Sequence, residues 1–97
     1  MRLIYSPLVQ RDVAEVLGYY DEVGSPELGD AFFDELCTRA ELVRQHPERF
    51  HRAPGELRRV NLKKFPYHFL FRVLGDVVRV LVVRHNRRHP SFGLRRK

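Results

Sequence analysis

The sequence has a single cysteine, no long hydrophobic run and almost no acidic residues in its last part. One cysteine, Cys37, excludes an intramolecular disulfide framework and is typical of a reducing cytoplasm, where we expect the protein to lie. No apolar stretch approaches the ~20 residues that a membrane helix needs, and the first residues do not form a leader peptide, so no membrane contact is expected. We find no internal repeat, low-complexity segment or linker, and we predict one domain over residues 1–97.

Charge is distributed unevenly along the chain. There are 18 Lys and Arg against 12 Asp and Glu, which gives a formal net charge of +6. Eleven of the twelve acidic residues precede Leu57 and only Asp76 follows it, so the first part of the chain is net acidic and the last part is strongly cationic. A surface of this kind attracts polyanions, either nucleic acid or an acidic protein.

Apolar spacing predicts one strand, two helices and three further strands. Residues 2–6 are typical of a short strand, and the pairs Ser6-Pro7 and Ser25-Pro26 predict two helix starts. The apolar residues that follow recur at helical spacing, with ends expected near Gly24 and at His46-Pro47. A loop is expected over 46–56, and a period of two then predicts strands at 57–64, 67–74 and 77–85.

The expected fold class follows from this order of elements. It is α+β, β-α-α-β-β-β, with an antiparallel sheet and a helical hairpin packed on one face. If both hairpins have two-residue loops, Phe69 faces Val82 and Leu62, while Phe71 faces Val80 and Val60. The face under the helices then carries Val60, Leu62, Tyr67, Phe69, Phe71, Val73, Val78, Val80 and Val82. The opposite face carries Arg59, Asn61, Lys63, His68, Leu70, Arg72, Arg79, Leu81, Val83 and His85.

This register predicts a row of arginines, Arg59, Arg72 and Arg79, across three strands. Like charges directly opposite each other destabilise a strand pair, whereas an anion bound between guanidinium groups stabilises them. One interpretation is a solvated face that simply carries its charges outward. The other is a binding face, which the aliphatic Leu70, Leu81 and Val83 among the cations favour.

Three stretches of the chain are distinctive together: SPLVQRDVAEVLGYY (6–20), HPERFHR (46–52) and LRRVNLKKFPYHFLFRVLGDVVRVLVVRHNRRHP (57–90). They resemble the RelE/ParE superfamily of bacterial type II toxin–antitoxin toxins, also called plasmid stabilisation proteins. The most specific part is FPYHFLFRV followed by VRVLVVRHNRRHP, because members commonly pair a Pro-aromatic strand with a terminal His-x-Arg-Arg. The likeness covers nearly the whole chain and is expected to extend to the fold.

The resemblance implies a small basic toxin that inhibits growth and is neutralised by a cognate acidic antitoxin, with which it could form a hetero-oligomer. No cofactor is implied. RelE-like members cleave mRNA on the ribosome, whereas ParE-like members inhibit DNA gyrase without cleaving. Phe92 stands where ribosome-dependent members usually carry a tyrosine, so the chain looks closer to the ParE-like side. Gyrase inhibition is favoured, and the question whether the protein is an enzyme stays open.

The candidate site residues depend on which activity is present. For a RelE-like endoribonuclease, the resemblance implies the catalytic residues Lys63, Arg72, Arg84, His85 and Arg88. Partner or anion contacts are expected from Arg59, Lys63, Lys64, Arg72, Arg79, Arg87, Arg88, His89 and Phe92. No metal site is expected, because the pairs His85/His89 and His46/His51 have no third ligand nearby.

Two further alternatives concern the rest of the surface. A plain nucleic-acid-binding module would interleave aromatic rings with cations on its exposed face, but Tyr67, Phe69 and Phe71 are expected in the core. The acidic residues of the first helix form either a solvated face or a set of contacts for the basic tail; they are Asp12, Glu15, Asp21 and Glu22.

Overall fold

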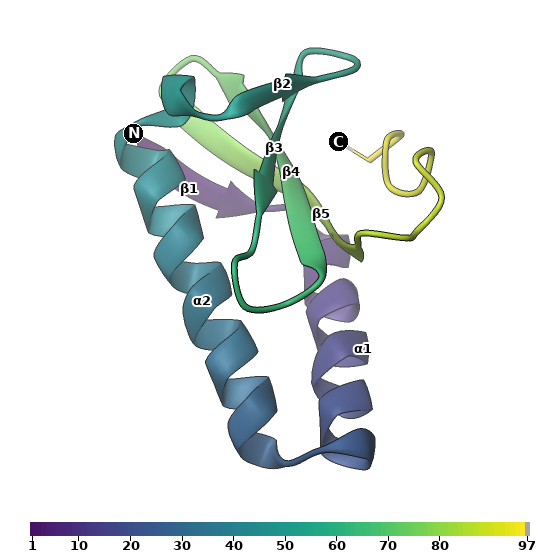
Figure 1. The fold of residues 1–97 in the computed structure, drawn as a ribbon. Helices are drawn as coiled ribbons and strands as arrows, with labels where there is room; N and C mark the ends of the chain where they lie inside the picture. Colours follow the sequence, from purple (N-terminus) through teal and green to yellow (C-terminus); the bar gives the residue numbers. More distant parts are fainter. Residues whose placement is uncertain (97) are drawn as a thin grey trace.

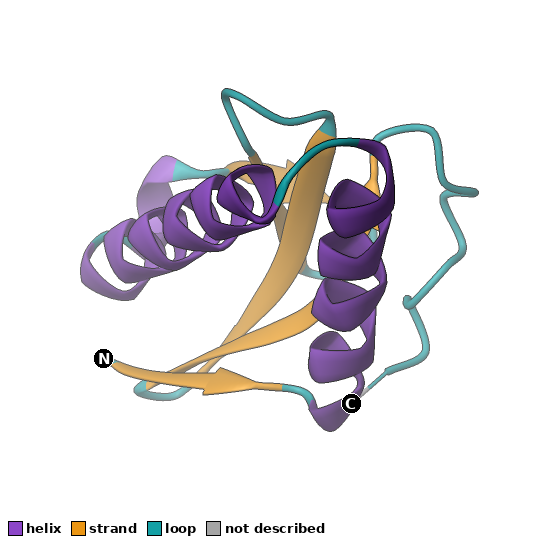
Figure 2. Cartoon of the chain, turned by 90° about the horizontal axis from the view of Figure 1, so that it is seen from below, coloured by secondary structure: helices purple, strands orange, loops and turns teal. Residues whose placement is uncertain are grey.

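The computed structural model describes residues 1–96 and confirms the α+β class (Figure 1). Two helices, α1 (Pro7–Val23) and α2 (Pro26–Gln45), form a hairpin over one face of a five-stranded sheet (Figure 2). The strands are β1 (Arg2–Tyr5), β2 (His51–Ala53), β3 (Leu57–Asn61), β4 (Tyr67–Leu74) and β5 (Val77–His85). Their order is β1-β5-β4-β3-β2, and β1 runs parallel to β5 while the other neighbours are antiparallel. Neither α1 nor α2 has the length and apolar composition of a membrane-spanning helix.

Both helices begin at the predicted serine–proline pairs. Ser6 and Ser25 are the N-cap residues and a proline follows each, but neither serine hydroxyl bonds an amide of its helix. The proline therefore sets the start, because its φ is already helical and it has no N–H to leave unsatisfied. The helices end before Gly24 and His46, as predicted.

The segment predicted to be a loop over 46–56 is more ordered than expected. A 3-10 turn, η1 (Pro47–Arg49), follows α2, and β2 then pairs with β3 through His51 and Arg59. The next strand is shorter than predicted and ends at Asn61 instead of residue 64. The backbone amides of Lys63 and Lys64 leave the sheet and donate to the Glu35 carboxylate of α2, Lys64 at 3.0 Å.

The β3–β4 register differs from the prediction by two residues. The connection spans residues 62–66, so Val60 pairs with Phe69 and not with Phe71. A shift of two keeps every side chain on its predicted face, because the side-chain period of a strand is also two. It places Arg59 opposite Leu70, and the predicted three-arginine row is therefore wrong; Arg72 does face Arg79.

A bulge in β5 changes which face several side chains occupy. Phe71 pairs with Val80 and Leu70 pairs with Val82, which leaves Leu81 as an extra residue. One inserted residue inverts the alternation that follows it. The predictions for three residues were therefore wrong: Val82 leaves the helix side, whereas Val83 joins the core there and His85 packs against Tyr67 on that side.

The main core lies between the helices and the sheet. Phe32 of α2 is fully buried and makes edge-on contacts with the rings of Phe65 and Tyr67, with centroids 5.6 and 5.3 Å away. Val73, predicted to lie in this core, is 38% exposed and lines a surface pocket next to η1 instead. Burial of the remaining large side chains supplies the main driving force for folding.

A second, smaller core occupies the other face of the sheet. It contains Leu57, Leu70, Leu81 and Val82, which are buried under Phe92 and Leu94. The covering residues belong to the strap, defined here as residues 86–96, which leaves β5 and folds back over this face (Figure 1). We call this face the strap face.

Gly93 allows the strap to approach the sheet closely. Its φ is +83°, a left-handed conformation, and a Cβ built on it would lie 2.6 Å from Val82 Cγ2. Only glycine fits without displacing Val82, which is itself fully buried.

We expect Gly93→Ala to lower the free energy of unfolding by about 1–3 kcal/mol, because the new methyl group overlaps Val82 and φ is unfavourable. Urea denaturation measures the loss, and hydrogen exchange should quicken at Phe92 and Leu94. The control is Gly18→Ala, which adds a methyl group into open space on α1 and should stabilise by up to about 1 kcal/mol. Equal effects of the two substitutions would contradict close packing of the strap.

Candidate functional site

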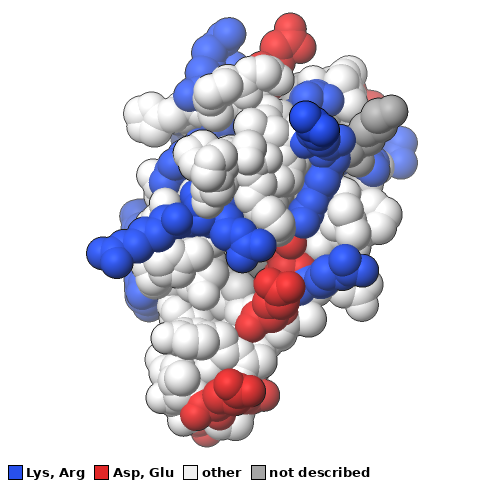
Figure 3. Space-filling model, turned by 90° about the vertical axis from the view of Figure 1, so that its right-hand side faces the viewer, with Lys and Arg blue, Asp and Glu red and all other residues white. Residues whose placement is uncertain are grey.

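Positive and negative charges are unevenly distributed on the face drawn in Figure 3. Most of its lysine and arginine side chains lie over the sheet end of the molecule, whereas carboxylates lie in the middle, at the end where α1 joins α2, and at one place at the sheet end. The basic residues that the sequence singled out do not form one continuous group. They divide into several sets, each held by different contacts.

Arg72 and Arg79 form the first set. They lie directly opposite each other on β4 and β5, and the Nε atom of each is buried without a hydrogen-bond partner within residues 1–96. Like charges at directly opposite positions destabilise a strand pair. Leu74, two residues beyond Arg72 on the same face, is 53% exposed.

Arg84 belongs to the second set, and its guanidinium fastens the strap. The side chain is buried; Nη1 donates to the carbonyl oxygens of Pro90 and Phe92 at 2.7 and 2.8 Å. Its Nε donates to His68 Nε2 at 2.9 Å. Arg84 thus joins β5, β4 and the strap through three directed contacts.

His68 is held in its neutral form. Because Nε2 accepts from Arg84, Nδ1 carries the hydrogen and donates to Asn86 Oδ1 at 2.8 Å. Burial is the main cause that lowers the pKa of His68 from its usual 6.5 to about 4, and the charges of Arg59, Arg84 and His85 lower it further, against the bond to Asn86. The sequence analysis placed His68 on the correct face but did not identify it as functional, because only the fold brings Arg84 and Asn86 to it.

Asp12 of α1 and Arg96 of the strap form a buried ion pair. Arg96 Nη1 lies 2.5 Å from Asp12 Oδ2 and Nη2 lies 3.0 Å from Oδ1, with the side chains 11% and 5% exposed. Asp12 Oδ2 also accepts the Val83 amide at 3.0 Å, and Arg96 Nη1 donates to the Leu81 carbonyl at 3.2 Å. The pair therefore satisfies backbone groups of β5 beyond Val80, where the pairing with β1 ends. The acidic residues of the first helix were expected either to form a solvated face or to contact the basic tail, and for Asp12 the contact with the tail is confirmed.

Two arginines of the strap, Arg88 and Arg96, lie against the ring of Phe92. The Arg88 guanidinium lies 3.9 Å from the Phe92 ring centroid and that of Arg96 lies 5.1 Å away, in cation–π geometry. Phe92 is half-buried and packs against the second core, so only part of its ring is exposed to solvent. Arg87 lies exposed in the turn after β5.

Three of the five candidate catalytic residues share one cleft. Arg84, His85 and Arg88 line a cavity of ≈ 190 Å³ together with two carboxylates, Asp12 and Glu15. The other two candidates lie elsewhere, Lys63 beside Glu35 of α2 and Arg72 beside Arg79.

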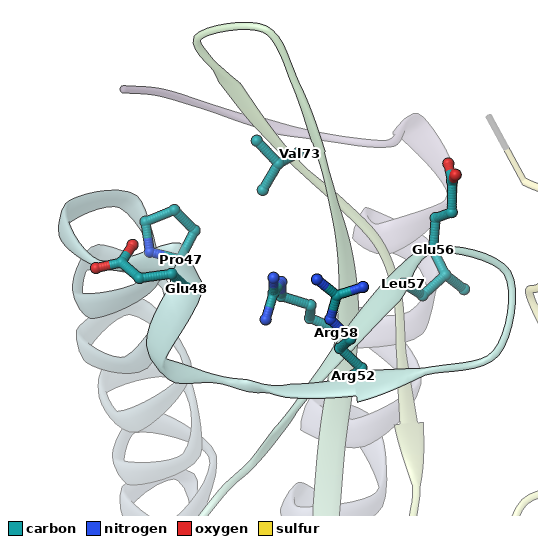
Figure 4. Close-up of a pocket in the computed structure, with 7 residues that line it drawn as sticks. All are labelled: Pro47, Glu48, Arg52, Glu56, Leu57, Arg58 and Val73. Atoms are coloured by element: carbon teal, nitrogen blue, oxygen red, sulfur yellow. The ribbon is translucent and has the colours of Figure 1, made fainter.

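Two arginines that the sequence analysis did not single out face each other across β2 and β3. Arg52 and Arg58 project into a pocket of ≈ 380 Å³ that also contains Glu48 and Glu56 (Figure 4). Arg58 Nη1 donates to the Phe50 carbonyl at 2.9 Å. No sequence signal marked this pair, because β2 is only three residues long and has no periodic pattern.

A larger cavity of ≈ 570 Å³ lies on the strap face. It brings Arg59, Arg84 and His89 together, with Arg52 at its edge. Two of these, Arg59 and His89, were predicted to bind a partner or an anion. Within residues 1–96, no group of three His, Cys, Asp or Glu side chains could hold a metal ion.

Comparison with known proteins identifies the fold. Neither a protein-family model nor a curated protein sequence matches the chain. A solved structure described as "Chromosomal ParDE TA system from P. aeruginosa" matches with a TM-score of 0.78 and 18% sequence identity, over 88% of this chain and 95% of that chain. The chain therefore shares its fold with a chain of that structure, and the predicted resemblance is confirmed at the level of the fold.

We expect Asp12→Asn to lower the free energy of unfolding by about 2–4 kcal/mol, because it leaves the buried Arg96 charge unpaired while keeping an acceptor for the Val83 amide. A double-mutant cycle with Arg96→Gln should give a coupling energy of about 1–3 kcal/mol. The control cycle uses Glu41 and Arg44, an exposed pair on α2 whose coupling should be too small to measure. Similar coupling in the two cycles would contradict a special role for the buried pair.

His68 should make stability depend on pH. Since its pKa is lowered in the folded state, the unfolded chain takes up the proton first, and stability that is complete above pH 6.5 is lost as pH falls to about 4. We expect wild type to lose about 1–3 kcal/mol more than His68→Gln over this interval, measured by urea denaturation at each pH. His51→Gln, at an exposed histidine, should behave like wild type. Parallel curves for wild type and His68→Gln would show that His68 is not held neutral.

Proposed function

We propose that this protein is the toxin component of a bacterial type II toxin–antitoxin system and is neutralised by a cognate acidic antitoxin. The observation that carries the proposal is the likeness to a chain of a ParDE toxin–antitoxin structure over 88% of this chain. The cationic surface around the sheet supports it, because a basic toxin and an acidic partner are complementary in charge.

The Arg72–Arg79 pair is the part of the surface best suited to an acidic partner. Its two buried Nε atoms have no acceptor among residues 1–96, and the adjacent Leu74 offers exposed apolar area. A carboxylate accepts from guanidinium groups in strong, charge-assisted bonds. Leu70, Leu81 and Val83, which were expected to supply the apolar contact, are buried, so Leu74 takes their place in the proposal.

We favour inhibition of DNA gyrase by binding over cleavage of mRNA. Cleavage needs an acid, a base and cations around one phosphate. Lys63 and Arg72 lie away from the cleft of Arg84, His85 and Arg88. That cleft also contains the Glu15 carboxylate, which repels a phosphate, whereas the Asp12 carboxylate is paired with Arg96. Arg84 is also occupied in fastening the strap. These contacts support a binding protein more than a RelE-like endoribonuclease.

A plain nucleic-acid-binding module receives less support. Tyr67, Phe69 and Phe71 are buried in the core, as expected, so they offer no stacking platform. We therefore keep the toxin proposal as the main one.

Expression of the protein alone in bacteria should arrest growth, and co-expression of the acidic protein from the neighbouring gene should restore it. A gyrase supercoiling assay beside a ribosome-programmed mRNA cleavage assay distinguishes the two targets, with inhibition expected in the first. Normal growth in cells that accumulate abundant folded protein would contradict the toxin proposal.

Arg72→Ala and Arg88→Ala should each weaken toxicity or target binding about tenfold, through the loss of one charged contact. Neither should lower stability by more than about 1 kcal/mol, because neither guanidinium has an ion-pair partner within residues 1–96. Arg49→Ala, at an exposed arginine of η1, is the control and should remain fully toxic. If thermal unfolding shows that both variants collapse, the assignment of these residues to a binding surface is wrong.

A further inference from the structure

The ≈ 570 Å³ cavity on the strap face is built by parts of the chain that are distant in sequence. Ala53 is the last residue of β2 and Pro54 follows it, Leu70 forms part of the floor, and the strap supplies a wall through Pro90 and Leu94. The wall is fixed, because Arg84 holds the Pro90 carbonyl and Arg96 anchors the end of the strap to Asp12. The cavity thus exists only while the strap is docked.

The ionisable side chains that line this cavity are all basic. They are Arg52, Arg59, Arg84 and His89. The two other clefts with arginines differ, because Glu48 and Glu56 accompany Arg52 and Arg58 in one, and Asp12 and Glu15 accompany Arg84 and Arg88 in the other. Arg52 and Arg84 each line two of these cavities, whereas Arg59 and His89 line this one alone, and no carboxylate among residues 1–96 lines it.

The cations are close enough to affect one another. Burial and the charge of Arg59 together lower the pKa of Arg84, and Arg59 also contributes to the lowered pKa of His68. Arg59 is half-buried, and its Nε donates to Asn61 Oδ1 at 2.8 Å, which orients the guanidinium. A bound anion would relieve the repulsion between Arg59 and Arg84.

The arrangement favours a phosphate group over a carboxylate or a nucleobase. The basic groups come from β2, β3, β5 and the strap, so they surround the cavity from several directions and match an anion with oxygens on all sides. A planar carboxylate is satisfied by one guanidinium fork. No aromatic side chain lines the cavity, so nothing there offers a ring on which a base could stack.

We propose that the cavity between β2, β3 and the strap is a binding site for a phosphate group, with Arg59 and His89 as its main donors and Arg84 as a fixed positive charge beneath them. The site does not depend on the toxin proposal, because it follows from the cavity and its charges alone. The phosphate group could belong to free phosphate or to a nucleotide, since both present the same oxyanion.

A titration of ¹⁵N-labelled protein with inorganic phosphate tests the site, at constant ionic strength against chloride. We expect saturable shifts of the amides of Arg59, Arg84, His89 and Ser91. Arg59→Gln should weaken the binding about tenfold or more, by loss of a charge-assisted hydrogen bond. His89→Gln, at an exposed position, should also weaken it and provides a second test if the first variant folds poorly. Arg49→Gln, outside the cavity, should bind within about twofold of wild type.

A nucleoside 5′-monophosphate distinguishes the two sources of the phosphate group. Equal affinity for both ligands indicates that the phosphate alone is recognised, and tighter binding of the nucleotide indicates that the sugar and base contact the floor at Leu70 and Leu94. The proposal is overturned if shifts spread over the basic surface without saturation, if Arg59→Gln and Arg49→Gln behave alike, or if an aspartate-rich peptide binds the cavity more tightly than phosphate. A protein that fails to arrest growth but binds phosphate in this way keeps the site and loses only the toxin function.

Discussion

The Asp12 carboxylate links the helices, the sheet and the strap. β1 covers the edge of β5 only as far as Val80, and the next backbone groups of that edge would otherwise be buried without partners. Asp12 accepts the Val83 amide and holds Arg96, which reaches the Leu81 carbonyl. Because Arg96 is near the end of the strap, this contact also keeps Phe92 and Leu94 over the second core. The larger cavity on the strap face exists for the same reason.

The bulge at Leu81 explains why one sheet can have a core on each face. It directs Leu81 and Val82 to the strap face while Val80 and Val83 stay under the helices. The centre of the strap face is consequently neither a solvated charged surface nor an open binding face, because the strap covers it. This centre is apolar, and the cations of the strap face remain in two separate places, Arg72 with Arg79 near the β4–β5 turn and Arg59 with Arg84 beside the strap.

Local signals in the sequence were reliable, and non-local ones were not. Ser6-Pro7 and Ser25-Pro26 act within one turn of chain, so both helix starts were predicted correctly. The strand partner of Arg59 depends on the length of the 62–66 connection, and the sheet face that Val82 occupies depends on the bulge at Leu81. Neither the connection length nor the bulge can be predicted from the spacing of apolar residues. The pairing of Asp12 with Arg96 joins residues 84 positions apart and was foreseen only as one alternative, from charge. The cavity required all of these at once and could not be predicted.

The strand order has a consequence for biosynthesis. β5 lies between β1 and β4, so the first strand to be made has no neighbour until residues 77–85 have left the ribosome. Until then the apolar stripes of α1 and α2 are only partly covered, and contacts between distant segments form slowly. The nascent chain therefore completes its sheet only after residues 77–85 have been synthesised.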